Sequence, residues 1–218
     1  MITRREFTVA AAATAFGLTG LGRAGSALAQ GAALVEGRDF VRLNAPVAVA
    51  AGGKIDVIEF FSYGCPHCYS FEPALEQWVK RLPADVAFRR VPATFNPTFE
   101  GYARLYYGLE ATGQVEALHK RVFAAIHVQR QRLDKEADIV AFMQANGVDG
   151  AKFAEHFKSF SVQTKQRQAK QLTESYRIDG VPTLGVQGMY VTSGSLAGSN
   201  ERALAVADKL VQGVRKPG

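Results

Sequence analysis

Val57-Ile58-Glu59-Phe60-Phe61-Ser62-Tyr63-Gly64-Cys65-Pro66-His67-Cys68-Tyr69 is the stretch that decides the fold. Its first half is an apolar run with the length of a buried strand, and its second half carries both cysteines of the chain. A Cys-x-x-Cys pair at the start of a helix can close a small disulfide ring there. Such a ring adds little stability, because the chain entropy that a disulfide removes grows with loop length. The pair therefore indicates redox chemistry rather than a structural bridge.

A zinc site is the main alternative for two cysteines at this spacing. Zinc takes four ligands, however, and the chain has no second pair of cysteines. The histidines outside the motif, His119, His127 and His156, lie apart in helical segments without ligand spacing. We expect neither a metal nor another bound cofactor.

The composition indicates a globular protein. Of 218 residues, 47% are apolar, which is enough for one sizeable core or a core with an insertion. The basic surplus includes Arg81, Arg89, Arg90, Arg130, Arg132, Lys165, Arg167 and Lys170. We interpret these charges as solvated helix faces, because a nucleic-acid site would interleave aromatic residues with a denser basic cluster.

The first 29 residues have the pattern of a cleaved export signal. A charged segment, Thr3 to Phe7, precedes a mildly apolar stretch, Val9 to Leu21, and then the small-x-small sequence Ala27-Leu28-Ala29. The apolar stretch is too short for a membrane anchor. The paired arginines of the charged segment, Arg4 and Arg5, are compatible with both twin-arginine and general secretion. Removing residues 1–29 lowers the net charge from +6 to +4.

Strand patterns flank the motif and return near the C-terminus. Phe40 to Leu43 alternates like an edge strand, Ile55 to Phe61 is apolar on both faces like a central strand, and Asp85 to Val91 is a third strand. A helix should begin at or near Cys65, where Pro66 suits the first turn. Two short strands, Thr183 to Gln187 and Met189 to Thr192, precede a last helix, Asn200 to Val214.

Residues 96–177 have helical patterns only. Five amphipathic segments are separated by helix-ending residues such as Gly113 and Gly147: Thr98 to Ala111, Val115 to His127, Lys135 to Ala145, Ala151 to Phe157, and Ser161 to Arg177. Aromatic side chains in and before the first segment could line a substrate groove, but helical spacing favours core packing for Phe95, Phe99, Tyr102, Tyr106 and Tyr107.

The motifs together resemble the DsbA family of periplasmic thiol oxidases. The resemblance rests on Glu59-Phe60-Phe61, on Cys65-Pro66-His67-Cys68-Tyr69 and on Gly180-Val181-Pro182-Thr183. It implies an α/β, thioredoxin-like fold with a helical domain inserted in the core. The expected division is a core formed by residues 30–95 and 178–218, with residues 96–177 as the insertion.

Cys65 is the expected nucleophile of a redox-active Cys65–Cys68 disulfide. At a helix N-terminus, unpaired N–H groups and the helix dipole favour its thiolate, and a protonated His67 would act in the same way. Because only the reduced protein carries this charge, stabilising the thiolate makes the disulfide an oxidant, and DsbA is a known example. Cys68, one turn further into the helix, is the expected partner sulfur. The alternatives are two buried structural cysteines and an idle surface histidine.

Glu59 is expected to be a catalytic acid. A carboxylate in an apolar strand is costly to bury without a task or a partner. Lying six residues before Cys65, it could exchange protons with Cys68. The alternative is a side chain that tilts toward solvent at the strand end.

Val181 and Pro182 are the expected substrate-binding residues. The resemblance implies a cis peptide bond between them, packed against the cysteine motif, with the Val181 backbone free to pair with an extended client. Base rates alone favour an ordinary trans proline.

The leading hypothesis is a monomeric periplasmic dithiol oxidase that donates its disulfide to reduced, unfolded client proteins. The resemblance implies re-oxidation by a quinone-linked membrane oxidase of the DsbB type. The alternatives are a disulfide isomerase or reductase, and a peptide-binding module without enzymatic activity. The 35 residues between Gln30 and Gly64 are too few for the dimerisation domain of an isomerase, and Pro66-His67 is not the Gly-Pro pair usual in reducing thioredoxins.

Overall fold

A mixed β-sheet organises the part of the chain that the computed structural model describes, residues 33–49 and 51–215. Its strand order is β1-β5-β4-β2-β3, and within it β2 and β3 run parallel while the other pairs are antiparallel. The strands are β1 (Val41–Arg42), β2 (Ile55–Phe61), β3 (Val86–Pro92), β4 (Thr183–Val186) and β5 (Tyr190–Ser193). The predicted signal segment, residues 1–29, lies outside the described residues.

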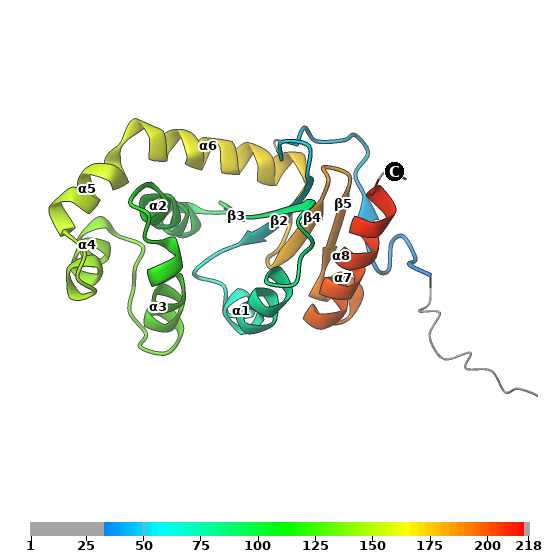
Figure 1. Ribbon diagram of the computed structural model, residues 1–218. Coiled ribbons are helices and arrows are strands. Elements are labelled where there is room, and N and C mark those ends of the chain that lie inside the picture. Colours follow the sequence, from blue (N-terminus) through cyan, green and yellow to red (C-terminus); the bar gives the residue numbers. More distant parts are fainter. Residues whose placement is uncertain (1–32, 50, 216–218) are drawn as a thin grey trace, which may run out of the picture. The chain divides into compact units, whose positions relative to one another are not determined.

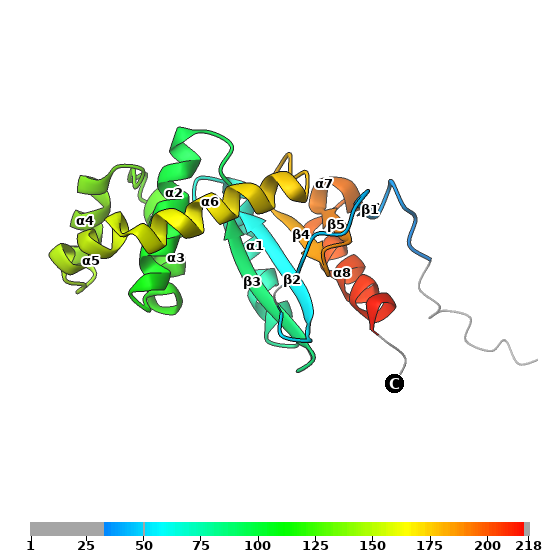
Figure 2. The same cartoon turned by 90° about the horizontal axis from the view of Figure 1, so that it is seen from above.

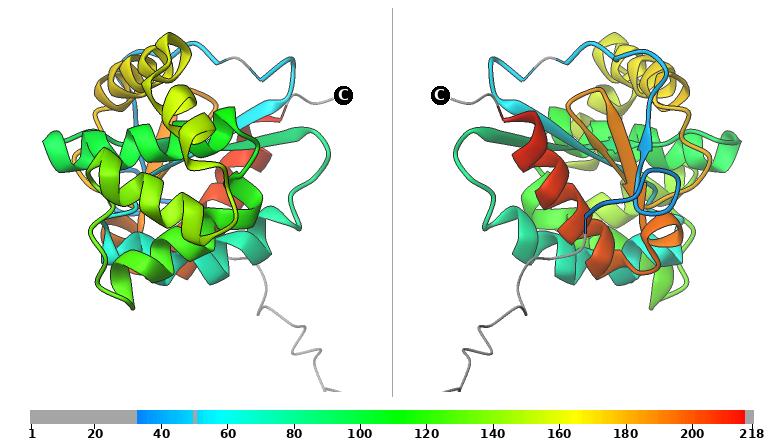
Figure 3. Two further views of the ribbon diagram at one scale, coloured as in Figure 1. Left: turned by 90° about the vertical axis from the view of Figure 1, so that its left-hand side faces the viewer. Right: turned by 90° about the vertical axis from the view of Figure 1, so that its right-hand side faces the viewer.

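Helices cover both faces of this sheet. Helices α1 (Pro66–Val79) and α8 (Asn200–Val214) lie on one face, and the C-terminal half of α6 (Phe160–Ser175) crosses the other (Figures 1 and 2). The segment between β3 and β4 is helical: α2 (Pro97–Ala111), α3 (Val115–His127), α4 (Glu136–Ala145), α5 (Gly150–Lys158) and α6. These helices face the viewer in the left view of Figure 3, and α8 does so in the right view.

Strand β2 lies at the centre of the core, and all seven of its residues are buried. Its side chains alternate between the two faces of the sheet. Val57 packs in the cluster formed with α1 and α8. Phe60 points the other way, and its ring centroid lies 5.1 Å from that of Tyr176 at the end of α6. The strand is therefore covered on both faces, as its near-continuous apolar pattern predicts.

Most predicted elements are confirmed within a few residues at their ends. The edge strand is β1, and the last helix begins at Asn200 with the Ser199 hydroxyl accepting from the Arg202 N–H. Helix α1 runs on through Pro73. The tight turn between β4 and β5 places Gln187 and Gly188 at positive φ angles of 51° and 64°, the geometry of a type I′ hairpin.

Three sequence-based interpretations need correction. The single turn α7 (Gly194–Ala197) was not predicted, because four residues carry no periodic signal. Arg89 and Arg90 lie in β3 rather than on a solvated helix face, and both pair with buried carboxylates.

Among the aromatic residues, Tyr102, Tyr106 and Tyr107 are in the core, but Phe95 is 42% exposed because it lies in the loop before α2. Its partner Phe99 is half-buried.

Gly185→Ala should destabilise the protein by about 1–3 kcal/mol, the usual range for overpacking. A Cβ at Gly185 would lie 2.5 Å from the buried Tyr176 ring and 3.3 Å from that of Phe60. The matched control is Gly213→Ala in α8, where a Cβ meets nothing within 4 Å and where alanine should stabilise the helix by about 0.5–1 kcal/mol. Denaturant unfolding measures both, and equal effects would contradict the packing argument.

Candidate active site

The cysteine motif begins helix α1 directly after β2. Cys65 is the N-cap residue with φ −92° and ψ 115°, and its sulfur accepts a hydrogen bond from the Cys68 N–H over 3.4 Å. Pro66 occupies the first turn, where an N–H would have no helical partner. As a thiol, Cys65 donates to the carbonyl oxygen of Val181, 3.3 Å away. The motif therefore faces the loop that precedes β4.

The two cysteines are unbridged, and their environments differ. Cys65 keeps 7% of its surface exposed, whereas Cys68 has none. Hydrogen bonds from the Cys68 thiol and from the backbone N–H groups of Cys68 and His67 lower the pKa of Cys65 to about 6, although partial burial opposes them. Burial, the hydrogen bond to Cys65 and the nearby charge of Glu59 raise the pKa of Cys68 far above that of a free thiol.

His67 and Pro66 both lie at the exposed surface of the motif. The positive charge of His67 helps to lower the pKa of Cys65, but it contributes less than the hydrogen bonds of the helix N-terminus and of Cys68. The expected direction of the histidine effect is present. The effect is smaller than that of the hydrogen bonds because His67 is exposed to water, which screens its charge.

The Val181–Pro182 bond is cis, as the resemblance implied. Both residues are half-buried beside the motif, and the carbonyl of Val181 points at the Cys65 sulfur. The downstream strand begins at Thr183, which pairs with Phe60 of β2. The sheet thus brings two segments together that lie 116 residues apart in the chain.

Glu59 is fully buried, so the alternative of a solvent-facing carboxylate is wrong. It lies in the middle of the sheet, and its Oε2 accepts from the Arg90 Nε at 2.9 Å. Its other oxygen has no hydrogen-bond partner among the residues that the structure describes. Burial raises the pKa of Glu59 to about 8, with Arg90 opposing the shift and the Glu72 carboxylate adding to it.

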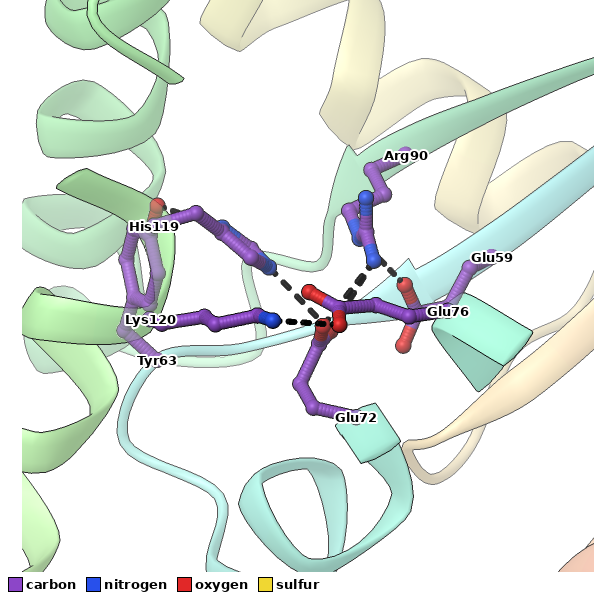
Figure 4. A network of polar contacts seen from close by, with 7 residues as sticks. All are labelled: Glu59, Tyr63, Glu72, Glu76, Arg90, His119 and Lys120. Atoms are coloured by element: carbon purple, nitrogen blue, oxygen red, sulfur yellow. Dashed lines mark hydrogen bonds and ion pairs between the residues drawn. The ribbon is translucent and has the colours of Figure 1, made fainter. Parts of the chain in front are cut away.

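A buried polar network extends from Glu59 across the base of α1 (Figure 4). The Arg90 Nη2 donates to both oxygens of Glu72, at 3.0 and 3.2 Å. The same carboxylate lies 3.1 Å from the His119 Nε2, and the His119 Nδ1 lies 2.8 Å from the Tyr63 hydroxyl. Sequence reasoning missed Glu72, Arg90 and Tyr63, and it considered His119 only as a metal ligand.

A second histidine of α3 contacts the active-site loop. The His127 Nε2 donates to the carbonyl oxygen of Tyr63 at 2.8 Å, and its ring stacks on Tyr69 with centroids 5.2 Å apart. Helix α3 is therefore joined to the segment just before Cys65.

Sequence comparison with known proteins identifies the family of this chain. The DSBA-like thioredoxin domain family matches residues 56–200. The chain is 43% identical to the thiol:disulfide interchange protein DsbA of Bordetella pertussis, over 96% of this chain and 98% of the relative. It is 39% identical to that of Pseudomonas aeruginosa, over 81% of this chain and 83% of the relative. The chain belongs to the DsbA family.

Solved DsbA structures share the fold. The crystal structure of Pseudomonas aeruginosa DsbA superposes with a TM-score of 0.79 at 39% identity, covering 81% of this chain and 92% of that one. NmDsbA1 of Neisseria meningitidis gives 0.74 at 28% identity, covering 84% and 94%. The predicted α/β, thioredoxin-like fold with inserted helices is confirmed, and the activity of the family is thiol:disulfide exchange with protein substrates.

Replacing either Cys68 or His67 in this DsbA-family motif should raise the pKa of Cys65. Cys68→Ala should raise it more than His67→Ser, because the Cys68 thiol makes the largest contribution and the histidine charge a smaller one. The thiolate absorbance of the reduced protein, followed against pH, measures both variants. The reverse order, or an ordinary thiol pKa in the unmodified protein, would contradict this account of the site.

Proposed function

We propose that the protein is a periplasmic dithiol oxidase that transfers its Cys65–Cys68 disulfide to reduced, newly exported proteins. Family membership gives the class of reaction. The direction is supported above all by the opposite pKa shifts of the two neighbouring cysteines. A sulfur that is stable as a thiolate is a good leaving group, and its stability in the reduced form favours acceptance of electrons.

The reaction begins when a client thiolate attacks the Cys65 sulfur of the disulfide. A client–Cys65 bond forms, the Cys65–Cys68 bond breaks, and Cys68 leaves with the electron pair. A second client thiolate then attacks the client sulfur, which forms the client disulfide and releases Cys65 as a thiolate. Two electrons pass from the client to the enzyme.

Glu59 supplies the proton that Cys68 needs as it leaves. The raised pKa of Cys68 means that its thiolate is unstable in this buried position. The Glu59 carboxyl lies close enough for its charge to raise that pKa, and its own pKa of about 8 keeps it protonated at neutral pH. A buried acid with these properties suits general-acid catalysis.

Val181 and Pro182 form the other side of the client site. The carbonyl of Val181 lies 3.3 Å from the Cys65 sulfur, so an extended client that pairs with this backbone would bring its own sulfur to Cys65. Pro66 and His67 flank the same sulfur from the exposed start of α1.

The proposal also covers the domains, the oligomeric state and the re-oxidation of the protein. After cleavage of residues 1–29, residues 30–95 and 178–218 form the thioredoxin-like core and residues 96–177 the helical domain of a monomer. No helix within residues 33–49 and 51–215 has the length and apolar character needed to cross a membrane. A quinone-linked membrane oxidase of the DsbB type re-oxidises the cysteines.

Redox equilibration with glutathione tests the function. The oxidised protein should oxidise reduced glutathione, so that Cys65 and Cys68 are mostly thiols in a buffer with equal concentrations of both forms of glutathione. Trapping the thiols by alkylation and counting them by mass gives the ratio. A mostly oxidised protein would instead indicate a reductase, and the absence of a reversible couple would indicate a binding module.

Glu59→Gln should slow client oxidation at least about tenfold below neutral pH, since general-acid assistance is worth about 10²–10⁴-fold. Because the pKa of Glu59 is raised to about 8, the rate constant per client thiolate should fall as the pH rises through 8 in the unmodified protein. The variant should lose that fall.

The matched control for this variant is Asp56→Asn. Asp56 is a buried carboxylate of the same strand that pairs with Arg89 at 3.0 Å, away from Glu59 and Arg90. It should leave the pH profile of client oxidation unchanged. Rapid-mixing kinetics with a cysteine peptide measures both variants, and an unchanged profile in Glu59→Gln would remove Glu59 from the reaction.

A further inference from the structure

Two carboxylates beneath the active site share one guanidinium. Glu59 and Glu72 are both buried, and both are hydrogen-bonded to the single guanidinium of Arg90. With both carboxylates ionised, the three groups carry one net negative charge, although the carboxylates themselves are almost fully buried. One additional proton makes the cluster neutral, which a buried site favours.

Hydrogen bonding to the two carboxylates is also unequal. Glu72 accepts from Arg90 at both oxygens and from His119 at Oε1. Within residues 33–49 and 51–215, Glu59 accepts from Arg90 at Oε2 only, and its Oε1 has no hydrogen-bond partner. Hydrogen bonds to a carboxylate favour the charged form, so the proton is placed more easily on Glu59.

Glu72 decides which His119 nitrogen carries the proton, and the Tyr63 hydroxyl is placed to accommodate that choice. Burial lowers the pKa of His119 although the hydrogen bond to Glu72 opposes it, so the ring is neutral. A carboxylate can only accept, so Nε2 must donate to Glu72, and Nδ1 is then free to accept from the Tyr63 hydroxyl. Both contacts are buried.

We propose that His119 is a positioning residue that assigns the single excess proton of the Glu59–Arg90–Glu72 cluster to Glu59. His119 donates a hydrogen bond to Glu72, which keeps that carboxylate ionised. The ionised Glu72 in turn holds the Nη2 of Arg90. The inference rests on the proposed function, in which Glu59 delivers this proton to Cys68. Two carboxylates in different environments are thereby given different tasks.

Other titratable groups surround the cluster. Those that face Glu59 or His119 are Cys65, Cys68, Glu72 and Glu76 from α1, Arg90 from β3, Tyr63 from the active-site loop and Tyr106 from α2. Glu76 is paired with Lys120 at the surface. The contact of His119 with Glu72 is therefore the one that distinguishes Glu72 from Glu59.

His119→Phe is the informative variant. A cavity of about 670 Å³ is lined by His119 and Arg90, so a smaller residue would admit water that could donate to Glu72 in place of the histidine. Phenylalanine fills the space among the rings of Phe61, Tyr106 and Phe123, which lie 5.1–6.3 Å away. The double variant Tyr63→Phe/His119→Phe also removes the hydroxyl that the single change leaves without its partner. His119→Gln is the conservative control, because its amide can still donate to Glu72.

The measurement is a site-resolved carboxyl NMR titration of Glu59 and Glu72 in the oxidised protein, which carries no thiolate charge. In the unmodified protein Glu59 should hold its proton to about pH 8. Both phenylalanine variants should lower the pKa of Glu59 and raise that of Glu72, each by at least about one unit, which is a tenfold change in each proton affinity. His119→Gln should keep the original order, and client oxidation by the phenylalanine variants should lose its dependence on the protonation of Glu59.

The outcomes separate the inference from the function on which it rests. If Glu59 keeps its high pKa in both phenylalanine variants, the role of His119 is wrong while the oxidase stands. If Glu59 titrates like an exposed carboxyl in the unmodified protein, both the inference and the proton delivery to Cys68 are wrong. A failed glutathione titration would remove the oxidase itself, whatever the carboxylates do.

Discussion

One guanidinium shared by two buried carboxylates holds the active site together from below. Arg90 of β3 bonds to Glu59 of β2 at 2.9 Å and to Glu72 of α1 at 3.0 Å, so it joins the central strand, the edge strand and the helix that carries the cysteines. Removing it would take the cationic partner from both carboxylates and leave the buried Glu72 with the neutral His119 alone, which is costlier than losing a surface ion pair. The position of the cysteine helix on the sheet depends on this contact.

The two cysteines, one helical turn apart, differ because the helix begins between them. Cys65 precedes the first turn, where N–H groups have no helical acceptor, and its sulfur accepts from the Cys68 N–H. Cys68 is inside the helix and has no exposed surface, and a negative charge on Cys65 or Glu59 raises its pKa further. One sulfur is therefore stable as a thiolate and the other as a thiol, which is the asymmetry that an oxidising disulfide needs.

Much of the fold could be predicted from local pattern, and the site only in part. The apolar run of β2, the helix after Cys65 and the helices between residues 97 and 175 follow from periodicity and capping, which act over a few residues. The buried network left a weaker signal. Asp56 and Glu59 in one strand are matched by Arg89 and Arg90 in the next, and the parallel register places Arg90 opposite Glu59. That pairing is visible only once the two strands are known to be neighbours.

The groups of the proposed reaction could be named from the sequence alone: two cysteines around Pro66-His67 at a helix start, an acid in the preceding strand, and a Val181-Pro182 pair far downstream. Their pKa values, by contrast, depend on the tertiary structure. The hydrogen bonds of Arg90 to Glu59 and Glu72, and of His119 to Glu72, join residues that lie 18 to 47 positions apart. The pKa of a buried group depends on distances through space, and local sequence does not specify those distances.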